Sequence, residues 1–521
     1  MVVQRTSTMP VSRDLPAMEL GHAPSSRIPD PPVLAVYQRL VDQFTRERVA
    51  WCYWKSSRRV AEGLAGQSDL DILVATESWH AARRVLLACG FRMFIAVGSR
   101  ADLSVECYLT YDEASGKIAQ VDLHTRLMLG SALLKTHRLP WEKSLIRRAV
   151  ANNGAGIPIL DAASEAVLLV IRASLELRWA DPVAARHWHA VTQKFALDRA
   201  LLARRTDLEA LRRRASELLD EHTAKLVVEA WLDQRPLHSQ GNLRRGLRRA
   251  LARFRVTGAA EAWLRGTWRG IQASAGFVNA HSLHWPRPWS RRVAGGGIVV
   301  AVIAVDGAGK STLVRGLQDW LAGVVDVLPL YFGTGDGRPT WFLAPFKLLV
   351  PLVSKLLPTK PQGSSHGTVT DAKPSFVYSL LLTLWASAVA LEKRTKLRSA
   401  HRAACRGMLV ITDRFPQDET AQFNDGPLLS RLNGVPRWLR AFEASAYALA
   451  RELRPDLVIK LIASPELIAS REPTMDHAVI QSRTEALDQL RLGGAPITLI
   501  PASLPAAAVL YSAKTAIWRA L

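Results

Sequence analysis

Short apolar runs alternate with helical patterns in the C-terminal part of the chain. These runs are rich in β-branched residues: Ile298–Val305, Val327–Phe332, Met408–Thr412, Leu457–Ile462 and Ile497–Ile500. Continuous apolar strands separated by helices are typical of a parallel sheet that is covered on both faces. The pattern therefore predicts an α/β domain with a parallel sheet.

The N-terminal part has a different pattern, in which helical periodicity is mixed with short β-rich runs. Leu70–Val74, Ser104–Tyr111 and Lys117–His124 are predicted strands, and Ser115-Gly116 marks a hairpin turn between the last two. This pattern predicts an α+β domain.

Residues from about 160 to 280 are predicted to be helical almost throughout. In Ala162–Trp179 and Arg199–Leu232, leucine, alanine and valine recur at spacings of three and four residues, with arginines between them. Leu243–Arg255 carries six arginines against Leu247, Leu251 and Phe254. This basic amphipathic helix has two interpretations: a solvated face of a helical bundle, or a surface that contacts phosphate or anionic lipid.

Ser282–Gly297 holds two prolines and three glycines without any period, so we predict a domain boundary there. Residues 1–32 are rich in proline, serine and isolated charges, and we expect a disordered leader. The predicted multidomain α/β organisation is a leader (1–32), an α+β domain (33–155), a basic helical region (156–281), a linker (282–297) and a C-terminal domain (298–521).

Composition restricts the partners but does not select one. The net charge is +22, which favours nucleotides, nucleic acid or an anionic membrane surface, although a general compositional bias is the alternative. The four cysteines (52, 89, 107 and 405) have no metal-binding or disulfide spacing, which fits a reducing cytosol.

Two apolar segments bear on membrane contact. Trp341–Pro358 carries two lysines and three prolines, which is typical of an amphipathic or irregular segment. Phe376–Leu391 has sixteen residues without a charge, fewer than the ~20 that span a bilayer. We expect a buried helix there, with membrane-surface contact and a true span as the alternatives, and hence a cytoplasmic protein or one peripheral to the inner face of the membrane.

The first apolar run of the C-terminal domain leads into a glycine-rich phosphate-binding pattern. Ile298–Val305 is followed by Asp306-Gly307-Ala308-Gly309-Lys310-Ser311-Thr312, and Leu313–Leu321 then has a helical pattern. Glycines let backbone amides converge on phosphate oxygens, and the start of a helix adds free N–H groups and its positive dipole end. The pattern therefore predicts a P-loop that binds ATP with Mg²⁺.

Each residue of this loop has an expected role. Lys310 is expected to reach the β- and γ-phosphates, and the Ser311 hydroxyl to ligate Mg²⁺. Ala304 stands where the usual pattern has its first glycine, and its methyl group fits if its φ is negative. The predicted ATP-binding residues are Gly307, Ala308, Gly309, Lys310, Ser311 and Thr312.

The sequence V-D-G-A-G-K-S-T resembles the P-loop of the thymidylate kinases, in which an acidic residue precedes the glycines. Asp306 matches that position, and the resemblance implies that it faces the acceptor's sugar hydroxyl or a catalytic arginine. Val410-Ile411-Thr412-Asp413-Arg414-Phe415 is similar to the family's D-R-[YFH] motif at a strand end. By resemblance, Asp413 lies near Mg²⁺ or the attacking oxygen, and Arg414 clamps the acceptor phosphate.

Weaker similarities continue along the domain. Pro455–Lys460, followed by Ser464-Pro465-Glu466, resembles the family's fourth strand and the entry to its lid. Arg471 and Arg483 are then candidate lid arginines, or else solvated helix charges. No thymine-reading set is recognisable between Tyr331 and Ala404, so the resemblance implies the fold and the use of ATP but does not identify the acceptor.

A second candidate site lies in the N-terminal domain. Asp69 and Asp71 are two apart on a predicted strand, so their side chains fall on one face, and Asp122 lies on a strand that is expected nearby. Three converging carboxylates bind Mg²⁺ ions for nucleotidyl transfer. This arrangement resembles the nucleotidyltransferase fold, although Trp54-Lys55-Ser56-Ser57 replaces its usual glycine-serine turn. Lys55 and Ser57 are the candidate phosphate contacts there.

We therefore predict a thymidylate-kinase-like phosphotransferase fused to a nucleotidyltransferase-like domain, with ATP and Mg²⁺ as cofactors. The expected partners are a nucleotide and a small phosphorylated acceptor, with an anionic membrane surface as a further candidate; nucleic acid is not expected. Two alternatives remain: a nucleotide-regulated scaffold associated with membrane or polysaccharide assembly, and an enzyme whose main activity is N-terminal nucleotidyl transfer.

Overall fold

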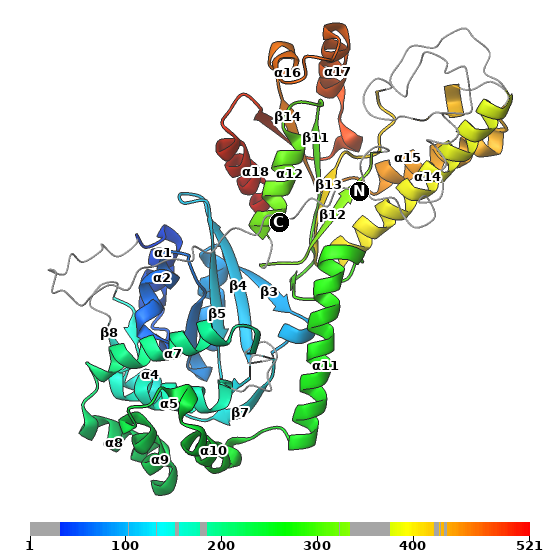
Figure 1. Ribbon diagram of the computed structural model, residues 1–521. Helices are drawn as coiled ribbons and strands as arrows, with labels where there is room; N and C mark the ends of the chain where they lie inside the picture. The colour runs from blue at the N-terminus through cyan, green and yellow to red at the C-terminus, as the bar shows by residue number, and fades with distance from the viewer. Residues whose placement is uncertain are drawn as a thin grey trace.

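A computed structural model of the protein describes residues 32–102, 104–131, 133–151, 156–177, 185–321, 324–333, 376–420, 427, 429–431 and 435–521. The architecture is multidomain α/β, as the sequence predicts, and contains two large sheets (Figure 1). Along the chain, a run of helices separates most strands of the first sheet from those of the second. Residues 1–31 of the predicted leader and the segment Trp341–Pro358 lie outside the described residues.

The N-terminal sheet is mixed and has the strand order β10-β3-β4-β5-β2-β1-β9-β8. The three predicted strands are present as β2 (Leu70–Val74), β4 (Val105–Asp112) and β5 (Lys117–His124). The hairpin between β4 and β5 depends on Gly116, whose φ of 71° lies in the left-handed region that favours glycine. The other strands are β1 (Trp51–Tyr53), β3 (Arg92–Ala96), β8 (Val150–Ala151), β9 (Pro158–Ile159) and β10 (Arg291–Val293).

Four helices and a second, two-stranded sheet complete this domain. The helices are α1 (Ala35–Arg46), α2 (Val60–Leu64), α3 (Trp79–Ala88) and α4 (Glu142–Arg147). The small sheet pairs β6 (Leu127–Gly130) with β7 (Lys135–Leu139) in antiparallel register.

The middle region consists of separate helices. They are α5 (Ala162–Glu176), α7 (Trp188–Ala203), α8 (Leu208–Leu218), α9 (Glu221–Leu232), α10 (Gly241–Ala250) and α11 (Ala259–Val278). Arg199–Leu232 is helical as predicted, but it is divided among α7, α8 and α9. Asp207 and Asp220 begin new helices, because each side chain accepts a hydrogen bond from the first turn that follows it.

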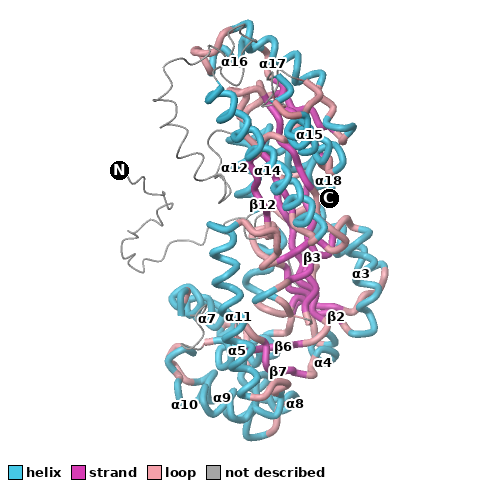
Figure 2. Tube along the Cα trace, turned by 90° about the vertical axis from the view of Figure 1, so that its right-hand side faces the viewer, coloured by secondary structure: helices cyan, strands magenta, loops and turns pink. Residues whose placement is uncertain are grey.

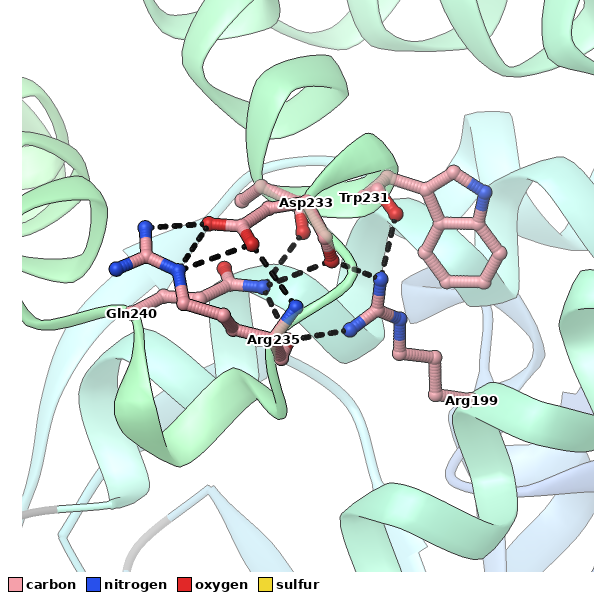
Figure 3. Close-up of polar contacts among 6 residues, drawn as sticks. Arg199, Trp231, Asp233, Arg235 and Gln240 are labelled. Atoms are coloured by element: carbon pink, nitrogen blue, oxygen red, sulfur yellow. Dashed lines mark hydrogen bonds and ion pairs between the residues drawn. The ribbon is translucent and has the colours of Figure 1, made fainter.

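A polar junction joins α7 to the end of α9 (Figure 3). The Arg199 guanidinium donates to the carbonyl oxygens of Trp231 and Arg235, each at 2.8 Å, and also to that of Asp233. Gln240 Nε2 donates to the Arg235 carbonyl at 2.9 Å and to the Ala230 carbonyl at 3.0 Å. These bonds satisfy carbonyl groups that the end of α9 leaves without helical partners.

All five predicted strands of the C-terminal sheet are confirmed, and all pair in parallel in the order β12-β13-β11-β14-β15. They are β11 (Val299–Ala304), β12 (Val327–Tyr331), β13 (Leu409–Asp413), β14 (Leu457–Ile462) and β15 (Ile497–Pro501). Figure 1 shows α12 (Lys310–Leu321) and α18 (Ala506–Ala520) on one side of this sheet, with α14 (Phe376–Cys405) and α15 (Arg437–Glu452) on the other. Figure 2 shows the strands enclosed between these helices. The remaining helices are α16 (Pro465–Arg471) and α17 (His477–Gln489).

The apolar segment predicted as a buried helix is the first half of α14. It is buried on one face, at Ala386, Val389 and Ala390, but Leu380 and Leu384 on the other face are 49% and 47% exposed. Among the described residues, no helix is both long enough and apolar enough to cross a bilayer.

The two sheets are in direct contact. β10, which lies inside the segment predicted as a linker, pairs with β3 at the edge of the N-terminal sheet. The Asp326 carboxylate accepts backbone N–H bonds from Trp289 at 3.0 Å and Ser290 at 2.7 Å, just before β10. The Phe94 and Trp518 rings stack across the boundary with centroids 6.2 Å apart. One apolar core therefore runs through both sheets.

Candidate functional site

The glycine-rich loop joins the end of β11 to the start of α12. Gly307 and Gly309 have φ angles of 85° and 91°, which side-chain-bearing residues rarely adopt. A Cβ on Gly307 would also lie 2.7 Å from Glu472 Cγ. Ala304 is the last residue of β11 and does not have a positive φ, so its methyl group is compatible with the turn. The loop thus opens onto the N-terminus of α12, which begins at Lys310.

Three cations from three separate elements surround the Asp306 carboxylate. Arg414 Nη2 lies 3.1 Å from Oδ1, Arg483 Nη1 lies 3.3 Å from Oδ2, and Lys310 Nζ lies 3.7 Å from Oδ1. The Asp306 side chain is 41% exposed, whereas those of Lys310 and Arg483 are 9% and 14% exposed. Asp306 therefore holds a cluster of positive groups beside the loop.

Asp413 lies at the carboxyl end of β13, next to β11 in the sheet. Its Oδ1 is buried and accepts no hydrogen bond from the described residues, and Lys310 Nζ lies 3.4 Å away. The Ser311 side chain is exposed on the first turn of α12. A hydroxyl and a carboxylate oxygen without a hydrogen-bond donor are ligand types that suit Mg²⁺, so the residues present fit this cation.

The candidate lid arginines both lie at the loop. Arg471, at the end of α16, donates from Nη1 to the Gly307 carbonyl at 3.4 Å and from Nη2 to the Ala502 carbonyl at 3.2 Å. Arg483, on α17, contacts Asp306 as described above. The structure thus brings all six charged candidates of this domain together: Asp306, Lys310, Asp413, Arg414, Arg471 and Arg483.

A small pocket adjoins this cluster at the carboxyl ends of β12 and β13. Arg414 forms part of its wall and has a φ of 64°, an uncommon conformation for a non-glycine residue that is typical of functional sites. The Phe332 and Phe415 rings lie 5.6 Å apart in the same wall. The other lining residues are Gly333, Lys393, Pro416 and Gln417. Lys393 and Phe332 could not be identified as site residues from the sequence, because neither belongs to a recognised phosphate-binding or strand-end motif.

The three N-terminal carboxylates also come together. Asp71 on β2 is paired with Asp122 on β5, and Asp69 directly precedes β2. Oxygen atoms from the three side chains lie within 4.8 Å of one another. Their spacing would allow them to ligate a common divalent cation.

The surroundings of Asp71 and Asp69 differ in charge. Lys55 Nζ lies 2.5 Å from Asp71 Oδ1, and His124 Nε2 lies 3.1 Å from the same atom. Burial opposes ionisation of Asp71, but Lys55 and His124 outweigh it and hold the pKa of Asp71 well below its usual range. Burial, followed by the charge of Asp71, raises the pKa of Asp69. Lys55 therefore supplies a cation at the position where a metal ion would neutralise Asp71.

The turn that carries Lys55 is tied to the helical region. The Ser56 hydroxyl donates to Asp198 Oδ1 at 2.9 Å, and the Ser57 N–H donates to Glu165 Oε1 at 2.8 Å. Of the two candidate phosphate contacts, Lys55 faces the carboxylates, and the Ser57 hydroxyl accepts from Arg205 at 3.4 Å. Side chains of α5 and α7 thus complete a turn that the sequence pattern assigns to the N-terminal domain alone.

A large cavity opens beside the carboxylates. Its charged lining includes Lys55, Arg100, Asp102, Asp122, Lys135, Glu176, Arg269 and Arg291. Burial lowers the pKa of Lys135 and, just outside the lining, lowers the pKa of Lys194 to about 8. The cavity lining therefore combines several cations with Asp122 of the carboxylate cluster.

No protein-family model matches the chain. The chain is similar to two proteins of Escherichia coli strain K12. It is 29% identical over 227 residues to the uncharacterized ATP-binding protein YghS. This match covers 43% of this chain and 93% of YghS. It is also 29% identical over 227 residues to the uncharacterized ATP-binding protein YghR, which covers 42% of this chain and 86% of YghR.

Proposed function

We propose that the C-terminal domain is an ATP-dependent phosphotransferase that moves the γ-phosphate of MgATP to a nucleotide or another phosphorylated small acceptor. The observation that carries the proposal is the convergence of Lys310, Arg414 and Arg483 on Asp306 beside the glycine-rich loop. Phosphoryl transfer depends mainly on positioning and on stabilising charge, and such a cluster provides both. The similarity to YghS and YghR, which are named as ATP-binding proteins, supports nucleotide binding.

On the ATP side, the backbone amides of 307–309 and the start of α12 would bind the phosphates, and Lys310 would reach the β- and γ-phosphates. Ser311 and Asp413 would hold Mg²⁺. Mg²⁺, when bound, would neutralise the charge that develops on the phosphate oxygens.

On the acceptor side, Arg414 would bind the acceptor phosphate through its planar guanidinium. The wall next to it carries two phenylalanine rings and Lys393, which offer an apolar surface and a positive charge to an anionic acceptor. Asp306 holds Arg414 and Arg483 in place through ion pairs, so the cations are positioned before the substrates bind.

The proposal is tested by incubating the purified full chain with γ-labelled ATP and a panel of nucleoside monophosphates and sugar phosphates. We expect a labelled product from at least one acceptor, and no product from Lys310→Ala. ATP binding without any labelled acceptor would instead favour the nucleotide-regulated scaffold. A fully active Lys310→Ala variant would refute the assignment of the loop.

A second candidate function rests on the Asp69, Asp71 and Asp122 cluster and its cavity. We propose that this site transfers a nucleotidyl group, with the carboxylates holding Mg²⁺ and the cavity cations binding phosphates. The double variant Asp69→Asn/Asp71→Asn should abolish release of pyrophosphate from nucleoside triphosphates. It should leave the labelled-phosphate transfer of the C-terminal domain unchanged, which separates the two proposals.

A further inference from the structure

Helix α11 exposes an unusual number of large apolar side chains. On α11, Trp263, Leu264, Trp268, Ile271 and Val278 are 69%, 60%, 61%, 55% and 47% exposed, respectively. These five residues form the α11 stripe, since their spacings place them on one face of the helix. Phe277, Leu283 and Trp285 extend the exposed apolar surface beyond it, at 56%, 48% and 55% exposure. None of the residues of α11 is buried.

The opposite face of α11 contacts the protein through small residues. Ala273 lines the cavity, and a Cβ on Gly276 would lie 2.9 Å from Trp289 Cβ. On the same side, Arg269 donates to the Leu133 carbonyl at 2.7 Å and to that of Ala101. A surface helix of a globular protein normally packs its large apolar face inward. In α11 the large apolar side chains face outward instead, so the stripe does not contribute to this chain's core.

The charges near the stripe are basic. Within α11 the charged residues are Glu261, Arg265 and Arg269, and Glu261 is already paired with Arg265 at 2.6 Å. The turn and helix that precede α11 add exposed arginines at positions 245, 249 and 255. Figure 1 shows α11 along the edge of the molecule, with a loop leading into its first turn from the end of α10. A basic segment of the chain thus leads directly into a helix with an exposed, tryptophan-rich apolar stripe.

We propose that α11 lies in the headgroup region of an anionic membrane, with the stripe inserted among the upper acyl chains. Tryptophan prefers this interface because its ring is largely apolar and its N–H reaches water. The exposed arginines in the segment that precedes the helix would attract anionic headgroups, each by about 1 kcal/mol near such a surface. The helix is amphipathic and lies along the protein surface, which is the geometry of interfacial binding.

Charge also favours lipid over a second copy of the chain as the occupant of the stripe. The net charge is +22, so two copies would repel each other, whereas an anionic bilayer would attract this surface. If the proposed function holds, association through α11 would keep the C-terminal phosphotransferase site at the membrane surface.

The test is co-sedimentation of the full chain with vesicles of phosphatidylcholine alone and of phosphatidylcholine with about one-third phosphatidylglycerol. We expect binding to the anionic vesicles and little to the neutral ones. Trp268→Glu/Ile271→Glu should lower the partition coefficient roughly tenfold or more, because two apolar groups that would insert among the acyl chains become charged. Both positions are exposed, so folding should be retained and is checked by circular dichroism.

Trp438→Glu/Leu499→Glu is the matched control, since it places the same two charges at residues that are 70% and 59% exposed in the C-terminal domain. It should bind vesicles like the unmodified chain. Equal binding by the α11 variant, or no binding by the unmodified chain, would overturn the proposal. So would a dimer in light scattering that the α11 variant alone dissociates, because the stripe would then be a contact between copies.

Discussion

Arg414 Nη2 lies 3.1 Å from Asp306 Oδ1, so the arginine after β13 is held by the acidic residue that precedes the glycines of the loop. The same carboxylate holds Arg483 from α17 at 3.3 Å through its other oxygen. One exposed carboxylate therefore fixes the positions of two guanidinium groups that come from distant parts of the sequence. Its removal should affect substrate positioning more than folding.

Asp306→Asn should therefore lower kcat/KM for the acceptor by about 10- to 100-fold, because Arg414 and Arg483 lose the charge that orients them. ATP binding, measured by calorimetry, should change little. Asp319→Asn removes an exposed carboxylate from α12 and is the matched control. An unchanged kcat/KM in Asp306→Asn would show that the ion pairs do not position the arginines.

Lys55→Met should raise the affinity of the N-terminal carboxylates for Mn²⁺ by roughly tenfold. The Lys55 ammonium lies 2.5 Å from Asp71 Oδ1, so a metal ion must compete with it for the same charge. Isothermal titration with Mn²⁺ measures the change, with Lys143→Met, whose lysine side chain is 74% exposed, as the control. Weaker Mn²⁺ binding in Lys55→Met would contradict the competition.

Arg214→Ala should destabilise the helical region by about 3 kcal/mol. The Arg214 side chain is 1% exposed and donates to Ser164 at 2.7 Å and to Ser144 at 3.0 Å, joining α8 to α5 and α4. Urea unfolding followed by circular dichroism gives the free energy of unfolding. The neighbouring Arg213 is exposed, so Arg213→Ala should stay within about 0.5 kcal/mol. Similar losses in the two variants would contradict the importance of burial.

Lys194→Met tests a pH dependence. Burial, with the charge of Arg172 next in importance, lowers the pKa of Lys194 to about 8 from 10.5, so the unfolded chain binds more protons between these two pH values. The contribution of Lys194 to the free energy of unfolding therefore rises with pH between about 8 and 10.5. Lys194→Met should raise the free energy of unfolding by about 2 kcal/mol at pH 7, with the gain shrinking toward pH 10. Comparing the two chains by urea unfolding at each pH isolates this residue, and a gain that is independent of pH would contradict the assignment.

The strands and the glycine-rich loop could be predicted because their signals are local. A β-branched run such as Ile298–Val305 and the glycines after it are constrained by backbone geometry and by burial on both faces. The same holds for Asp69 and Asp71, which share a face because strand side chains alternate.

Other features depend on tertiary packing and left no local pattern. Arg483 reaches Asp306 only because α17 packs over the loop, and a charge at that position otherwise looks like a solvated helix residue. β10 is three residues long and forms because the edge of β3 is available, so its proline- and glycine-rich surroundings indicated only a linker. The breaks before α8 and α9 are different, since Asp207 and Asp220 are local helix-start signals, but the apolar spacing continues across both positions and favours a continuous helix.

Because β10 belongs to the sheet of the preceding domain, the polypeptide cannot be divided at its proline- and glycine-rich segment without damage to both parts. A fragment that ends before residue 291 would leave the β3 edge unpaired, and the complementary fragment would expose the ring of Trp518 that now stacks on Phe94. Each half expressed alone should aggregate, whereas the two halves produced together should reassemble. Evolutionary replacement of one half by an unrelated domain would have to preserve the pairing of β10 with β3 and the stacking of Trp518 on Phe94.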